Sequence, residues 1–164
     1  MRPALPDRVD CARLAEEGAV LNRVYPLREL SRLQDVLADT EGELKASFAF
    51  AKLANGDAGA EVSIEAAPHL TCQRCLKAYT APISTRSAVQ FAGSEEAEPV
   101  NAEREIYVTE SGTASLKELA EEELLLALPI VAAHDSDGAC KAAPEERNDR
   151  TRPFAGLKDL LKKT

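Results

Sequence analysis

Cys72 and Cys75 are separated by two residues. Their type and spacing make them the best candidates in this sequence for metal binding or redox chemistry. A CxxC turn points two thiolates in the same direction and so supplies half of a tetrahedral zinc site. The other half would come from His134 and Cys140, with His69 as a competing third ligand. The same cysteine pair also suits a redox dithiol, or a turn without any chemistry. The spacing alone therefore leaves three roles open.

The surroundings of the pair disfavour two kinds of catalysis. A redox thiol usually lies at a helix N-terminus that follows a strand, whereas Cys72 lies between two predicted strands with no βαβ pattern around it. We expect Cys11 to be an inert buried thiol. The sequence contains no glycine-rich phosphate loop, no HExxH and no GxSxG motif. It therefore predicts a protein that is not an enzyme and has no small-molecule substrate.

The strands that position the pair follow from alternating apolar residues. Residues 44–50 and 62–66 alternate with period two around a turn at residues 55–57, which predicts an antiparallel hairpin leading into the cysteines. Residues 79–91 and 106–108 predict further strands.

Helices are predicted before these strands in the sequence and again after them. Residues 10–17, ending at Gly18, and the leucine repeat at residues 27–37 predict N-terminal helices. Residues 115–128 predict a packed helix that Ser115 caps and Pro129 ends. The predicted fold is α+β: an antiparallel sheet or small open barrel with N-terminal helices and one packed helix at about residues 115–128.

The length of 164 residues suits a single domain, which we assign to residues 1–134. Residues 135–164 are expected to be a flexible segment that ends in a short amphipathic helix at about residues 153–163. The apolar side of that helix would consist of Phe154, Leu157, Leu160 and Leu161. No apolar run is long enough to span a membrane and no secretory signal is visible. The expected location is the cytoplasm.

The charge is unevenly distributed along the chain. A net charge of −8 argues against a general nucleic-acid binder. However, no acidic residue lies between Glu65 and Glu95, the segment that contains the cysteine pair. Four side chains of this segment could contact nucleic-acid phosphates or stack on an unpaired base, or else they only keep a sheet edge soluble. They are Arg74, Lys77, Arg86 and Tyr79.

An acidic face is predicted on the C-terminal helix. Glu118, Glu121 and Glu122 are expected to face water. Together with the acidic loop at residues 95–105, they could dock a basic protein. This surface is the basis of an alternative function, an acidic protein-interaction adaptor that binds a basic partner without direct RNA contact.

Three stretches in order, CQRCLKAYTAPI, EEELLLALPIVAAHDSDGAC and RPFAGLKDLLKK, resemble the YceD family of large ribosomal RNA subunit accumulation proteins of bacteria and plastids. The resemblance also reaches the N-terminal residues and covers nearly the whole chain. It implies a non-enzymatic cytosolic ribosome biogenesis factor that is needed for synthesis, processing or stability of the large-subunit (23S) ribosomal RNA. The implied partners are the precursor of that RNA, ribosomal proteins or assembly factors.

The resemblance also bears on the metal. Some relatives have cysteines near the region of His134 to Cys140, as in half of a zinc ribbon. This sequence offers one histidine and one cysteine there. This departs from the fuller cysteine pattern, so zinc, held by Cys72, Cys75, His134 and Cys140, is a candidate cofactor rather than one that the resemblance implies outright.

Overall fold

The computed structural model describes residues 7–134 and residue 140. The helices are α1 (Cys11–Glu17) and α2 (Leu116–Ala127), with two single 3-10 turns, η1 (Leu27–Glu29) and η2 (Ser31–Leu33). The strands are β1 (Arg8–Asp10), β2 (Val20–Pro26), β3 (Glu43–Lys52), β4 (Ala58–Ala66), β5 (His69–Thr71), β6 (Ala78–Thr80), β7 (Ile83–Ala92), β8 (Arg104–Val108) and β9 (Thr113–Ser115).

The main sheet has five strands in the order β2-β3-β4-β7-β8. The first four strands pair antiparallel, and the β3–β4 pair is the hairpin that the alternation predicted, whereas β2 was not predicted as a strand. Strand β8 pairs parallel with β7. The reason is the connection at residues 93–103, which carries the chain back before β8 begins and so lets it run in the same direction as β7. The α+β class is confirmed, and the sheet is mixed and open rather than a closed barrel.

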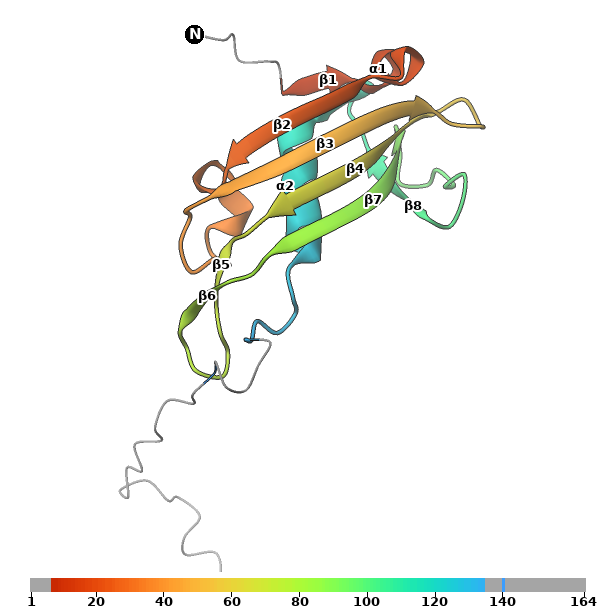
Figure 1. Ribbon diagram of the computed structural model, residues 1–164. Helices are drawn as coiled ribbons and strands as arrows, with labels where there is room; N and C mark the ends of the chain where they lie inside the picture. Colours follow the sequence, from red (N-terminus) through yellow and green to blue (C-terminus); the bar gives the residue numbers. More distant parts are fainter. Residues whose placement is uncertain (1–6, 135–139, 141–164) are drawn as a thin grey trace, which may run out of the picture.

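Helix α2 crosses one face of this sheet, while the opposite face carries no helix among the described residues (Figure 1). The hydroxyl of Ser115 accepts a hydrogen bond from the backbone N–H of Glu118, which starts the helix at the predicted residue. Apolar side chains of α2 and of the inward strand faces form the core; they include Leu44, Phe48, Val62, Ile64, Val89, Phe91, Leu116, Leu119 and Leu124.

The leucine repeat after Pro26 does not form the helix that we predicted from it. Its side chains are buried, but the backbone forms the two 3-10 turns, and Leu30 between them is extended. A spacing of three residues matches the three-residue turn of a 3-10 helix, so the same repeat buries its leucines without an α-helix. The first predicted helix is confirmed as α1, which Asp10 caps at its start and Gly18 at its end.

In the described part of the chain, no helix is long and apolar enough to cross a membrane. The assignment of residues 135–164 to a flexible segment with a terminal helix lies outside the described residues, apart from Cys140.

Candidate metal centre

The cysteine pair lies in a small hairpin that extends beyond the end of the main sheet (Figure 1). Strands β5 and β6 pair antiparallel, and the turn between them contains both cysteines. The backbone N–H of Cys72 donates to the carbonyl of Lys77 at 2.9 Å, and that of Leu76 donates back to the carbonyl of Cys72 at 2.8 Å. Leu76 adopts a left-handed backbone with φ of 59°. The turn therefore curls tightly around the two sulfurs.

Four potential metal ligands converge at this turn. The Sγ atoms of Cys72, Cys75 and Cys140 and a ring nitrogen of His134 all lie within 4.8 Å of one another. The Sγ atoms of Cys72 and Cys140 are 3.6 Å apart, and Cys75 Sγ is 3.7 Å from His134 Nδ1. These are the four ligands that the sequence predicted.

The spacing of these atoms fits a tetrahedral zinc ion. With Zn–S bonds of about 2.3 Å and a Zn–N bond of about 2.0 Å, two sulfurs lie about 3.8 Å apart and a sulfur and a nitrogen about 3.5 Å apart. The two separations above agree with these values to within a few tenths of an ångström. Three thiolates and one imidazole are also a donor set that zinc prefers. The residues present therefore fit the metal.

The chain that follows α2 is fastened to the hairpin just before His134. The backbone N–H of Gln73 donates to the carbonyl of Ala132 at 2.8 Å, and Arg74 Nη2 donates to the carbonyl of His134 at 3.2 Å. The rings of Tyr79 and His134 also pack together, with centroids 4.9 Å apart. These contacts hold the imidazole over the cysteine turn.

The thiols of the cluster differ in their affinity for a proton. Burial alone would raise the pKa of Cys72, but hydrogen bonds from the backbone of Cys75, Arg74 and His134 outweigh it and lower the pKa to about 5. Burial, reinforced by hydrogen bonds to Cys72 and Cys75, raises the pKa of Cys140 to about 11. The lowered pKa of Cys72 favours its thiolate, which is the form of cysteine that binds metals.

The chain's other histidine, His69, and its other cysteine, Cys11, lie outside this cluster. His69 was the competing ligand, but its Nδ1 lies 2.7 Å from Oδ2 of Asp39. The carbonyl of His69 also accepts a hydrogen bond from the backbone N–H of Ala38. Cys11 is buried in the core, and this burial raises the pKa of its thiol to about 11. His69 therefore helps to tie the hairpin to the η2–β3 loop instead of joining the cluster.

The candidate RNA-binding residues do not all lie together. Arg74, Lys77 and Tyr79 belong to the hairpin, where Lys77 is exposed and Tyr79 is half-buried against His134. Arg86 lies on β7 in the main sheet, where its Nε donates to Ser63 Oγ at 3.2 Å. The structure thus groups the first three around the cluster and leaves Arg86 apart.

The predicted acidic face of α2 is only partly correct. Glu118 is exposed and Glu122 is half-buried, but Glu121 is only 4% exposed, so the prediction that it faces water is wrong. Its Oε1 accepts from the backbone N–H of Arg32 at 2.7 Å, because η2 packs against that flank of the helix. The sequence reading also missed Glu123, which is 6% exposed and lies between α2 and the sheet. Its position three residues after Ala120 was a signal that it faces the core.

An open-sheet α+β fold with a cysteine–histidine cluster on a projecting hairpin defines the class of protein to which this chain can be compared. The family model for the large ribosomal RNA subunit accumulation protein YceD matches residues 60–161, and the chain belongs to this family. The match includes most of β4, the whole hairpin and all four cluster residues. No solved structure matches the chain. The family name connects the chain with accumulation of the large-subunit ribosomal RNA.

Proposed function

We propose that this protein is a non-enzymatic ribosome biogenesis factor of the cytoplasm that binds the precursor of the large-subunit (23S) ribosomal RNA through its cysteine–histidine hairpin. The observation that carries the proposal is the position of Arg74 and Lys77 on the turn that the four cluster residues hold. The family name supplies the RNA, and the hairpin supplies a surface without any acidic residue.

Zinc would have a structural role here. Cys72, Cys75, His134 and Cys140 would fill all four positions of a tetrahedron, which is the pattern of closed structural sites rather than of catalytic ones. The metal would link the hairpin to the chain after α2 and fix the backbone that carries the cations. This supports a binding function rather than an enzyme.

The RNA contacts would be mainly electrostatic. The logarithm of the RNA binding constant falls linearly with the logarithm of the salt concentration. For single-stranded RNA, each phosphate that a cation neutralises adds about 0.7 to the steepness of this slope. Losing both Arg74 and Lys77 should therefore reduce this slope by about 1.4. One face of the Tyr79 ring packs on His134, so only its remaining surface would be open to an unpaired base.

The test combines cells and purified protein. In a strain depleted of the protein, the double variant Arg74→Gln/Lys77→Gln should fail to restore large-subunit RNA levels and precursor processing. Purified, it should bind precursor RNA with the smaller salt slope. Its zinc content and Tm are measured alongside, because Arg74 also donates to the carbonyl of His134, and the single variant Lys77→Gln, which leaves that bond in place, should show about half of the change in slope. A matched control, Arg13→Gln/Lys52→Gln, removes two exposed cations far from the hairpin and should behave as wild type. Full restoration by the hairpin variant would refute the proposal, and Arg86→Gln tests separately whether the main sheet contributes.

A second candidate is the acidic adaptor. Glu122 and Glu95 line one depression beside β8, and Glu118 lines a neighbouring one; Tyr107 borders both. This surface would suit a basic ribosomal protein. Crosslinking in cells separates the two candidates: RNA crosslinks at the hairpin favour the first, and protein crosslinks at Glu118 and Glu122 favour the second.

A further inference from the structure

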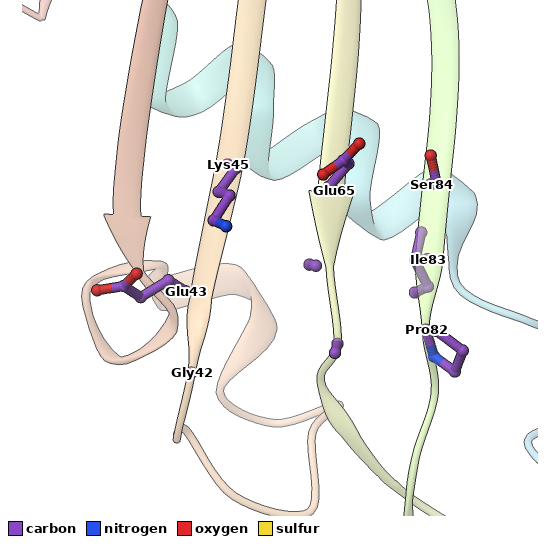
Figure 2. A pocket seen from close by; sticks show the side chains of 9 residues that line it. Gly42, Glu43, Lys45, Glu65, Pro82, Ile83 and Ser84 are labelled. Atoms are coloured by element: carbon purple, nitrogen blue, oxygen red, sulfur yellow. The ribbon is translucent and has the colours of Figure 1, made fainter.

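The face of the main sheet that lies away from α2 has a groove at its hairpin end. Figure 2 shows this face, with α2 behind the sheet. The groove has a volume of about 680 Å³. Its apolar end consists of Ala66, Pro82 and Ile83, and its rim carries Glu43, Lys45 and Glu65. A second depression of about 330 Å³ shares Lys45 and Glu65 with it and continues across the sheet towards β2.

The side chains around the groove allow another element to approach closely. Lys45 pairs with Glu65 across β3 and β4, Ser47 pairs with Ser63, and Glu65 pairs with Ser84 of β7. Most of these outward side chains are small, so a helix laid on the sheet would meet few obstacles. Exposed Val24, on the neighbouring β2, adds apolar surface at the far end.

The chain itself contains a segment that suits this groove. Residues 141–164 carry seven lysines and arginines against four acidic residues, a net charge of +3, whereas the rest of the chain carries −11. Within this segment, the pattern at residues 153–163 predicts a helix with Phe154, Leu157, Leu160 and Leu161 along one side. An apolar face of this kind gains stability only when another apolar surface covers it.

The stretch of chain from Cys140 to Phe154, here called the tether, is long enough to permit this contact. Cys140 Sγ lies 3.6 Å from Cys72 Sγ, so the segment starts at the hairpin. Five residues separate Cys72 from Ala67 at the groove, which is at most about 17 Å of extended chain. The fourteen residues from Cys140 to Phe154 can span up to about 46 Å. Moreover, the family match continues to residue 161, so the segment is part of what defines the family.

We propose that the basic amphipathic segment at residues 153–163 docks on its own domain, across the groove formed by Ala66, Pro82 and Ile83 and between the carboxylates of Glu43 and Glu65. Arg152, Lys158 and Lys162 would then lie near the carboxylates of Glu43 and Glu65, which outnumber the one rim cation, Lys45, while the leucines cover the apolar end. This proposal does not depend on the RNA-binding proposal, because it rests on the sheet face and the tail alone.

The four isoleucines of the chain provide the probes for a test. Ile83 lines the groove, Ile64 lies in the core, Ile106 lies on β8, and Ile130 is fully exposed after α2. The full chain is compared with the full-length variant Leu157→Ser/Leu161→Ser, which keeps length and charge but removes half of the apolar side. In spectra of isoleucine δ1 methyl groups, the Ile83 signal should differ between the two proteins and the other three should coincide.

The reciprocal variant is Ser84→Arg, which places a bulky cation on an exposed groove position. With 4-fluorophenylalanine, the buried Phe48, Phe50 and Phe91 report on the fold and Phe154 reports on the tail. The Phe154 fluorine signal should move in Ser84→Arg to the position that it has in the isolated peptide of residues 150–164. The three buried signals should stay in place.

Three results would overturn the proposal. An unchanged Ile83 signal would show that the tail leaves the groove open. A changed Ile130 signal with an unchanged Ile83 would place the tail on the exposed apolar residues after α2 instead. A difference at Ile83 that disappears on dilution would assign the contact to the tail of a second copy.

Discussion

The metal centre yields the sharpest prediction, because one ligand, Cys140, comes from a segment far along the sequence from the cysteine turn and can be removed without changing the turn itself. The variant Cys140→Ser keeps the turn of Cys72 and Cys75 but removes the sulfur 3.6 Å from Cys72 Sγ. The matched control is Cys11→Ser, which replaces a buried thiol outside the cluster. We expect wild type and Cys11→Ser to carry one zinc ion when purified without a chelator, and Cys140→Ser to lose it.

The size of the effect follows from the number of ligands. Structural zinc sites contribute about 10–16 kcal/mol at neutral pH, so one ligand of four is worth roughly 2.5–4 kcal/mol. The zinc dissociation constant of Cys140→Ser should therefore rise about 10²–10³-fold. Since the metal binds the folded state, the zinc-dependent part of the unfolding free energy should fall by a similar amount, about 3–4 kcal/mol at a fixed excess of zinc.

The assay is competition with a chromophoric chelator, combined with denaturant unfolding at constant free zinc. Cobalt substitution gives a second reading, because the intensity of its sulfur-to-metal absorption reports how many thiolates bind. If Cys140→Ser and Cys11→Ser hold zinc equally tightly, Cys140 is not a ligand and the geometric reasoning is wrong. If wild type binds no zinc at all, the cluster is not a metal site.

Three further predictions concern single side chains. Glu121→Ala should lower the unfolding free energy by about 1.5–3 kcal/mol in denaturant titrations, since it leaves the backbone N–H of Arg32 unpaired, whereas exposed Glu118→Ala should cost much less. Burial raises the pKa of Glu123, so its charged form destabilises the fold as pH rises through that pKa; Glu123→Gln should raise Tm at pH 8 and lose this advantage near pH 4. Leu76→Gly should stabilise the protein by up to about 1 kcal/mol, because a left-handed backbone strains leucine but not glycine and the side chain is 71% exposed. A lower Tm for Leu76→Gly would mean that the exposed side chain packs on something that the turn geometry does not reveal.

Local patterns were sufficient for the parts of the fold that depend on neighbouring residues. The strands β3 and β4 follow from alternation and a turn, and α2 follows from its Ser115 cap and its apolar spacing. The four cluster residues could also be predicted, because a CxxC turn needs partners and the chain contains few other histidines and cysteines.

The remaining features depend on contacts between distant elements. The side chain of Glu121 is buried only because η2 packs on that flank of α2, and nothing within the helix indicates it. The parallel pairing of β8 depends on where the chain goes between residues 93 and 103. The groove arises where the ends of β3, β4 and β7 meet, so no single stretch of sequence contains it.

The hairpin itself explains why a metal site belongs at this position. Strands β5 and β6 have three residues each, and a two-stranded hairpin of that size is marginally stable in water. It lies beyond the end of the main sheet, where α2 does not cover it (Figure 1). Leu70 on β5 joins the hydrophobic core and Tyr79 on β6 packs against it, but the cysteine turn beyond them is not part of that core. The contacts with His134 and Cys140 therefore stabilise this turn. Because Cys140 also begins the basic tail, the same contacts would fix the starting point of any segment that docks on the open sheet face. One metal ion would thus order both the hairpin cations and the tether.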